Sequence, residues 1–232
     1  MDEDIAIQLE QDLAWRKDEI RVLENSLQAL DESDAYDFSR RALILMLYAH
    51  FEGFCKHAFQ TYVDSINSMN LVCREVDHTL AASSLSHAFD DMLNNENKSG
   101  YFKNSLPDDR KLHRFARNTE FLQRIDEFNE VPVNIPDKII DLESNLKPTI
   151  IRKILFCLGF RYDLFSSMEG TINRLLNYRN NIAHGRMKNG IKYSDYCELK
   201  DSVYSMLTII SEQILKALED RNYLRCVSSG TA

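Results

Sequence analysis

Glycine and proline are scarce in this chain, with seven glycines and four prolines among 232 residues. Because these residue types end or kink helices, their scarcity favours long, uninterrupted helices. The five cysteines are widely spaced and include no C-x-x-C pair, so the sequence indicates neither a disulfide framework nor a zinc site. We therefore expect a protein of a reducing compartment that uses no metal or other cofactor.

The sequence also lacks an apolar run long enough to cross a bilayer. The stretch ALILMLYAHF, residues 42–51, is interrupted only by His50 and is followed by Glu52, whereas a spanning helix needs about 20 apolar residues. This stretch predicts a buried core helix and no membrane partner. The first residues, MDEDIAIQLEQD, are acidic where a secretory signal would be basic, which favours a cytoplasmic location.

Charge is distributed unevenly along the chain. The formal net charge is −8, and residues 1–38 carry twelve acidic against three basic residues, a net −9 that leaves +1 for the remainder. Within that remainder, residues 171–192 contain no acidic residue and five basic ones, namely Arg174, Arg179, Arg186, Lys188 and Lys192. This basic segment is suited to an anionic partner.

Apolar residues recur every three or four positions, which is the period of an amphipathic helix, and no segment alternates as a strand would. The spacing predicts a first helix over residues 3–30. A second helix is expected from Ser39, as its N-cap, to about residue 68. The two would form a helical hairpin, and the expected fold class is all-α.

Three further helices are predicted in the second half of the chain, over residues 147–159, 166–185 and 194–224. The first of them should end at Gly159, since glycine readily takes the left-handed conformation of a helix C-terminus. Ser166 and Glu169 have the spacing of a capping box, which would begin the second helix.

Residues 69–145 are less regular, with the turn-forming stretches NNENKSG, LPDD and EVPVNIPD, and predict an insertion of short helices and loops. Within it, residues 98–124 hold seven basic against three acidic residues, interleaved with Tyr101, Phe102, Phe115 and Phe121. Two interpretations remain open, a solvated helix face with core aromatics or a surface that follows a nucleic-acid backbone. A single domain over residues 1–226, with a disordered tail at 227–232, completes the expected organisation.

The stretch NYRNNIAHGRMKNG, residues 177–190, contains the main candidate site. Arg179 occupies a position that the apolar stripe of its helix would otherwise fill, so it should point toward the core or toward a partner. A buried guanidinium stays charged and needs acceptors. Either a carboxylate of the same chain, for which Glu52 is the obvious candidate, or an anion from outside must supply them.

His184 follows Arg179 by five residues and would point roughly 140° away around an unbroken helix. Gly185 can end the helix in a left-handed conformation, which frees His184 to point elsewhere. Asn180, one turn earlier, could bind a substrate or hold the imidazole. Histidine and arginine suit phosphodiester chemistry, as a proton carrier and as a bidentate partner for the phosphorane. Because one histidine cannot easily serve both sides of an in-line displacement, this hypothesis requires a symmetric dimer.

The string RNNIAHG, residues 179–185, resembles the signature of the HEPN superfamily, in which an arginine, a polar residue and a following histidine lie near the end of a helix. Three segments in order, LILMLYAHFEGFCKHAFQTYV, ESNLKPTIIRKILFCLGF and RNNIAHGRMKNGIKYSDY, are similar to a prokaryotic branch of HEPN-like nucleases. The resemblance implies a helical bundle that dimerises with its motifs facing each other and cleaves RNA without a metal. The products would carry 2′,3′-cyclic phosphate and 5′-hydroxyl ends.

The resemblance also implies roles for individual residues and a biological setting. Arg179 would bind the phosphate, Asn180 would be the polar residue after it, and His184 would transfer protons. Members often act as toxins of toxin–antitoxin pairs or as antiphage-defence effectors, so an antitoxin or another defence protein is an expected partner. We add Glu52 as an accessory residue, and as RNA-binding residues Arg174, Arg186, Lys188 and Lys192.

One position departs from the pattern. In HEPN toxins silenced by a nucleotidyltransferase antitoxin, a tyrosine two places after the histidine accepts AMP, and here that position is Arg186. Silencing by this modification is therefore not expected. The competing hypothesis is a non-catalytic helical interaction or nucleotide-binding module, in which Arg179 would pair with Glu52.

Overall fold

The computed structural model describes residues 2–28, 34–100, 110–143 and 145–225. Within these ranges the protein is all-α, as the sequence predicted. The strand-like pairings in the described residues are isolated bridges, Val72 with Pro132 and Val76 with Leu224.

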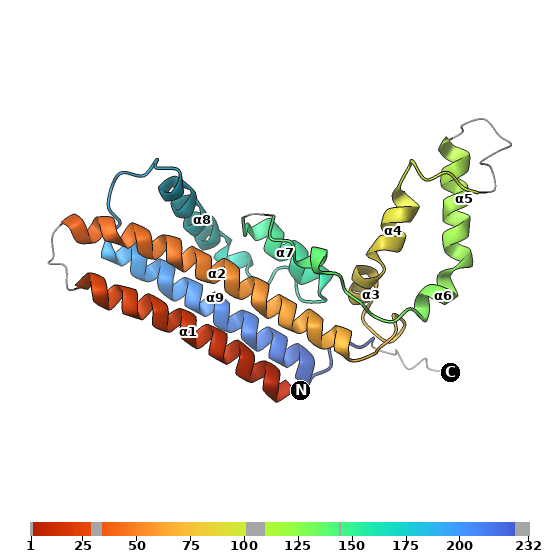
Figure 1. The fold of residues 1–232 in the computed structure, drawn as a ribbon, viewed down its shortest axis with the longest axis horizontal. Coiled ribbons are helices and arrows are strands. Elements are labelled where there is room, and N and C mark those ends of the chain that lie inside the picture. Colours follow the sequence, from red (N-terminus) through yellow and green to blue (C-terminus); the bar gives the residue numbers. More distant parts are fainter. Residues whose placement is uncertain (1, 29–33, 101–109, 144, 226–232) are drawn as a thin grey trace.

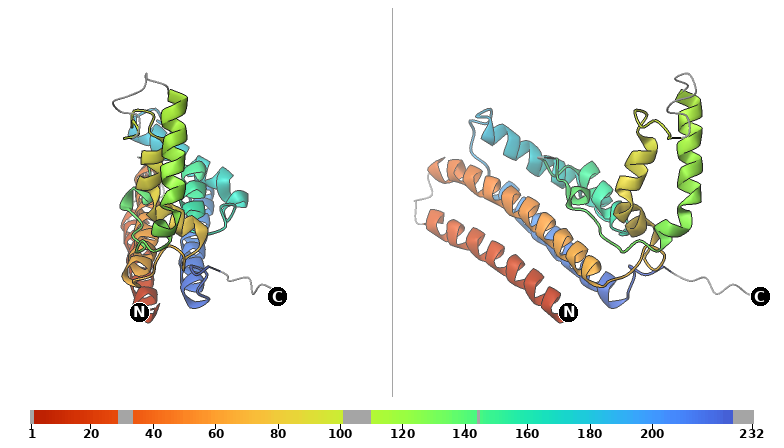
Figure 2. Two further views of the ribbon diagram at one scale, coloured as in Figure 1. Left: turned by 90° about the vertical axis from the view of Figure 1, so that its right-hand side faces the viewer. Right: turned by 45° about the vertical axis from the view of Figure 1, so that its right-hand side comes forward.

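Three long helices, α1 (Asp2–Gln28), α2 (Asp34–Ser68) and α9 (Tyr193–Glu219), lie side by side and form the body of the bundle (Figures 1 and 2). The shorter helix α8 (Glu169–Ala183) packs against α2 and α9. The apolar run predicted as a core helix lies in the middle of α2, where Leu43, Leu47 and Phe51 are buried. None of the described helices is both long and apolar enough to span a membrane.

Glycines end two helices where the sequence predicted. Helix α7 (Pro148–Cys157) is followed by Gly159 with φ +80°, and α8 is followed by Gly185 with φ +66°. Both lie in the left-handed region that glycine enters without steric cost.

Two predicted helix starts are wrong. Helix α2 begins at Asp34, so Ser39 lies inside the helix; an ion pair between Asp37 and Arg40, three residues apart, supports the additional turn. The predicted capping box at Ser166 is absent, because residues 166–168 form the 3-10 helix η2 (Ser166–Met168). Glu169 is instead the first residue of α8, where its carboxylate pairs with Arg152 at 2.5 Å.

One predicted helix end is also wrong. Helix α9 ends at Glu219 and does not reach Leu224. Arg221 takes a left-handed conformation with φ +54°, and the N–H of Asn222 donates to the carbonyl of Ala217 at 2.9 Å. A non-glycine residue thus closes this helix, which the sequence pattern did not indicate.

The irregular middle of the chain forms short helices, as expected: α3 (His78–Ser84), α4 (Ser86–Leu93), α5 (Arg110–Gln123), α6 (Ile125–Asn129) and the 3-10 helix η1 (Asp137–Ile140). Helices α4, α5 and α6, with the described residues between them, project from the bundle as an arm (Figures 1 and 2). Tyr101 and Phe102, and the tail at 227–232, lie outside the described residues.

Candidate active site

The end of α8 carries the predicted motif. His184 is the C-terminal cap, and its backbone N–H donates to the carbonyl of Asn180 at 3.0 Å. Beyond Gly185, the N–H of Arg186 donates to the carbonyl of Asn181 at 2.8 Å, which completes the turn. The imidazole of His184 is exposed and makes no hydrogen bond, ion pair or ring contact with another side chain among the described residues. It is therefore free to meet a substrate or a second subunit.

Arg179 is half-buried, and one edge of its guanidinium is held by neutral groups. Nη1 donates to Oδ1 of Asn180 at 2.9 Å and to Oδ1 of Asn145 at 3.2 Å. The group also lies over the ring of Tyr48, with 5.1 Å between Cζ and the ring centroid. Nε and Nη2 have no acceptor among the described residues. Asn180 therefore holds the arginine, and its side chain does not hold the imidazole.

Glu52 lies one turn after Tyr48 on α2 and makes no ion pair with Arg179 among the described residues. The two charges still interact at longer range. Partial burial raises the pKa of the Glu52 carboxyl, while the positive charges of Arg179 and Lys56 act in the opposite direction. No carboxylate among the described residues therefore contacts the guanidinium.

Glu52 also borders a groove of about 590 Å³ between α2 and the segment around η1. Lys56 and Gln60, at successive four-residue steps along α2, line the same groove. Sequence analysis missed Lys56 as a site residue, although its spacing from Glu52 places both on one helix face. The groove brings a basic side chain next to Glu52.

The loop after the motif, residues 186–192, is fixed to the first turns of α2. Arg41 Nη1 donates to the carbonyl of Met187 at 2.8 Å, and Arg40 Nη1 donates to that of Ile191 at 2.8 Å. Gly190 packs so closely that an added Cβ would lie 2.8 Å from the carbonyl carbon of Asp37. We call this segment the basic loop, since it carries three of the predicted RNA-binding residues, Arg186, Lys188 and Lys192.

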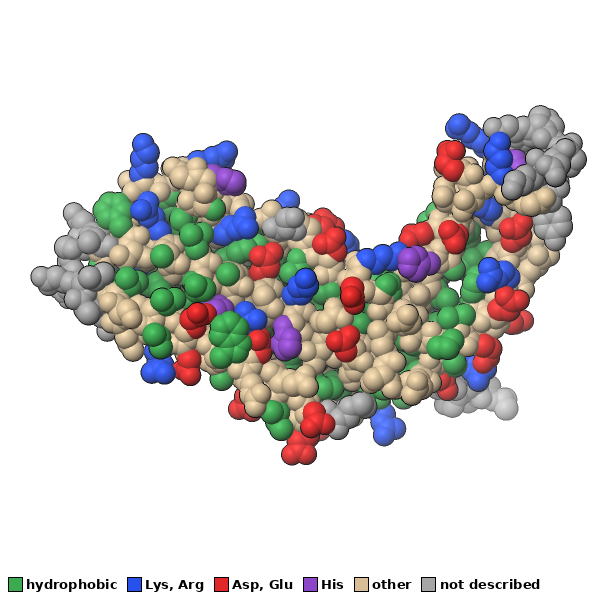
Figure 3. Space-filling view, in the orientation of Figure 1, with side chains coloured by type: hydrophobic (Ala, Val, Ile, Leu, Met, Phe, Trp, Pro, Cys, Tyr) green, Lys and Arg blue, Asp and Glu red, His purple; other side chains and the backbone are tan. Residues whose placement is uncertain are grey.

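The side chains of those three residues are exposed. Basic side chains and a histidine gather over the end of α8 in Figure 3. The fourth predicted RNA-binding residue, Arg174, is engaged within the chain, because its Nη2 lies 3.0 Å from Oε2 of Glu198 on α9. Arg174 would have to leave this ion pair, or share it, to contact an RNA.

The histidines of α2 lie in the packed body of the protein. His50 is buried beside Trp15, with Nε2 3.0 Å from Oε2 of Glu19, and His57 is half-buried. Across the described parts of the chain, no three His, Cys, Asp or Glu side chains are grouped as metal ligands.

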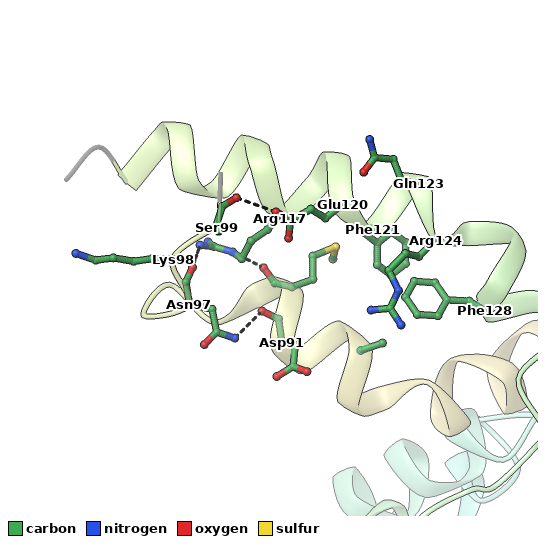
Figure 4. Close-up of a pocket in the computed structure, with 13 residues that line it drawn as sticks. Asp91, Asn97, Lys98, Ser99, Arg117, Glu120, Phe121, Gln123, Arg124 and Phe128 are labelled. Carbon is green, nitrogen blue, oxygen red and sulfur yellow. Dashed lines mark hydrogen bonds between the residues drawn. The ribbon is translucent and has the colours of Figure 1, made fainter. Parts of the chain in front are cut away.

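A second hollow, of about 420 Å³, lies in the arm between α4, α5 and α6 (Figure 4). The buried Arg117 donates across it to the carbonyls of Met92 at 3.0 Å and Asn97 at 2.6 Å. Phe121 packs against Phe128, with 5.0 Å between ring centroids, as a core aromatic would. Phe115 is 70% exposed, as an aromatic residue of a nucleic-acid surface would be. Phe121 thus fits one interpretation of this segment and Phe115 fits the other, and both stay open. The arm stands apart from the end of α8 (Figure 1).

These features define a class of protein: an all-α bundle with a helix-end site that holds an exposed histidine and an arginine whose Nε and Nη2 have no acceptor among the described residues. The model of the MAE_28990-like HEPN family matches residues 5–223. The chain therefore belongs to this HEPN family, as the sequence resemblance implied. No curated protein and no solved structure matches it.

Proposed function

We propose that the protein is a metal-independent endoribonuclease whose active site is completed by a second copy of the chain. The observation that carries the proposal is the open edge of Arg179, whose Nε and Nη2 have no acceptor among the described residues while neutral amides hold Nη1. A guanidinium presented in this way can donate two parallel hydrogen bonds to a phosphate. HEPN proteins are generally associated with ribonuclease activity, which agrees with this chemistry.

In the proposed reaction, the 2′-oxygen of a ribose attacks the adjacent phosphorus and the bond from phosphorus to the 5′-oxygen breaks. His184 of one protomer takes the 2′-hydroxyl proton, and His184 of the other gives a proton to the leaving 5′-oxygen. Arg179 stabilises the charge of the phosphorane between them. The products are a 2′,3′-cyclic phosphate and a 5′-hydroxyl.

A dimer supplies what one chain lacks. A general base and a general acid must act on opposite sides of the phosphorus, and each chain offers one histidine at the end of α8. The exposed position of His184 allows a two-fold axis to bring a second copy opposite the first. The basic loop would then flank the shared cleft and attract the RNA backbone.

In the cell, such an enzyme fits a toxin or an antiphage-defence effector that a partner protein restrains until it is needed. Arg186 stands two places after His184, where some HEPN toxins carry the tyrosine that accepts AMP. The restraint is therefore not expected to be AMP transfer to that position. The competing interaction-module hypothesis requires a contact between Arg179 and Glu52, and these described residues make no ion pair. The absence of that contact favours the ribonuclease.

The test is incubation of the purified protein with mixed RNA in the presence of EDTA. We expect cleavage by the unmodified chain and its loss in His184→Ala and in Arg179→Ala. The exposed His87 provides a control, since His87→Ala should cleave normally. Cleavage that survives both site substitutions would remove the assigned site, and cleavage abolished by EDTA would remove metal independence.

A further inference from the structure

We propose that Asn145 and Tyr48 are positioning residues that aim the open edge of Arg179 toward the phosphate. Neither residue has a role in the site predicted from the sequence. The inference rests on the proposed function of Arg179 and concerns how the orientation of its guanidinium is fixed. It draws on contacts from three separate segments of the chain: α2, the residues before α7, and α8.

Tyr48 supports the arginine in two ways. Its ring lies against the guanidinium, 5.1 Å from Cζ to the centroid, an arrangement in which a cation is attracted by the face of an aromatic ring. Its hydroxyl accepts a hydrogen bond from the backbone N–H of Leu146 at 2.9 Å. Because Leu146 follows Asn145, one buried side chain both contacts the arginine and anchors the segment that bonds to it.

Asn145 is itself held by its backbone. Its N–H donates to the carbonyl of Leu142 at 3.0 Å, and its own carbonyl accepts from the N–H of Lys147 at 2.8 Å. The next residue, Leu146, is completely buried. The amide oxygen of Asn145 is therefore presented to Arg179 from a fixed backbone, as a preorganised site requires.

The neutrality of these groups matters as much as their placement. A carboxylate at position 145 would pair with the guanidinium and reduce its attraction for an RNA phosphate. An amide oxygen orients Nη1 and leaves the positive charge in place. With Nη1 bound to two amides, the plane of the guanidinium is set and the edge formed by Nε and Nη2 faces away from them.

The decisive variant is Asn145→Asp, which changes the side chain by one group and adds a negative charge beside Arg179. We expect kcat/KM for RNA cleavage to fall roughly 10- to 100-fold, without a decrease in the thermal unfolding midpoint. The matched control is Asn134→Asp, which adds the same charge at an exposed position between α6 and η1 and should leave both quantities unchanged. A merely structural role for Asn145 predicts that activity and stability change together.

Tyr48→Phe tests the role of the hydroxyl apart from that of the ring. The variant keeps the contact with the guanidinium but leaves the N–H of Leu146 unbonded, so we expect RNA cleavage to decrease, as it should in Asn145→Ala. Side-chain nitrogen NMR supplies a readout that does not depend on activity. The two Nη signals of Arg179 should be distinct in the unmodified protein and averaged in Asn145→Ala.

The outcomes separate the two proposals. If Arg179→Ala abolishes cleavage but Asn145→Asp and Asn145→Ala cleave at the unmodified rate, the positioning role is wrong and the ribonuclease stands. If the unmodified protein cleaves no RNA, the proposed function fails, and the NMR signals alone decide whether Asn145 holds the arginine. Averaged signals in the unmodified protein would overturn the positioning role.

Discussion

The guanidinium of Arg179 lies over the ring of Tyr48, 5.1 Å from Cζ to the ring centroid, although 131 residues separate the two in the sequence. This contact joins α8 to α2 at the point where the predicted site begins. It gives the arginine an apolar face to rest on and a side from which water is excluded. Hydrogen-bond acceptors are then needed only along the edges of the guanidinium, and the acceptors among the described residues all lie at Nη1.

Replacing Arg179 by lysine tests the importance of that geometry. Arg179→Lys keeps a positive charge but loses the planar fork, so we expect RNA cleavage to fall by about 100-fold or more. The free energy of unfolding should change by only about 1 kcal/mol, because the lost hydrogen bonds are partly exposed. Steady-state cleavage and chemical denaturation measure the two effects. Arg161→Ala, at an exposed position after α7, is the control, and near-normal cleavage by Arg179→Lys would contradict the bidentate role.

The basic loop should contribute affinity more than catalysis. Lys188→Ala removes an exposed charge, so we expect weaker binding of single-stranded RNA, measured in a His184→Ala background. The slope of the logarithm of affinity against the logarithm of salt concentration should also become smaller by about 0.7. Fluorescence anisotropy across a range of salt concentrations gives both values. Lys216→Ala, an exposed position in the last turn of α9, should leave them unchanged. Equal effects of the two substitutions would argue against a local RNA surface.

Two glycines offer opposite predictions for stability. Gly190→Ala would place its Cβ against the backbone of Asp37, so the basic loop must lift from α2 and the free energy of unfolding should fall by about 1–3 kcal/mol. Gly170→Ala, inside α8, meets no atom within 4 Å and should stabilise the protein by roughly 0.5 kcal/mol. Urea denaturation distinguishes them. A harmless Gly190→Ala would show that the loop is not fixed as described.

His50 should make stability depend on pH. Burial lowers its pKa, Arg16 adds to this effect, and the nearby carboxylates of Glu19 and Asp12 oppose it. Because the folded pKa is below the unfolded one, the unfolded chain binds a proton more readily. The stabilising contribution is thus complete above about pH 6.5 and is lost as the pH falls toward the folded value. Between pH 7.5 and pH 5.5, the free energy of unfolding should fall more for the unmodified chain than for His50→Gln, as measured by denaturation at the two pH values. Equal decreases would refute a lowered pKa of His50 in the folded protein.

The sequence was most informative where one residue type has one physical consequence. Gly185 predicted the end of α8, and its positive φ confirms that inference. The arginine within an apolar stripe predicted a side chain that needs acceptors, and Arg179 is half-buried among them. Both conclusions follow from local periodicity and backbone sterics.

The partners of Arg179 could not be found in this way. The sequence left two acceptors open, the carboxylate of Glu52 within the chain or an anion from outside, since a buried charge suggests an opposite charge. The observed acceptors include the neutral Asn145, 34 residues away in the sequence, whose position depends on how α7 packs. The capping box at Ser166 failed for a related reason. Residues 166–168 form a 3-10 turn, and Glu169 pairs with Arg152 instead of with the helix start.

The central claim is that two copies of the chain share one active site, and subunit mixing tests it most directly. The unmodified protein is combined with a variant carrying both Arg179→Ala and His184→Ala, the subunits are allowed to exchange, and RNA cleavage is measured against the fraction of unmodified chains. A shared site predicts that activity falls as the square of that fraction, to about one quarter in an equal mixture. A linear decrease, to about one half, would contradict the shared site.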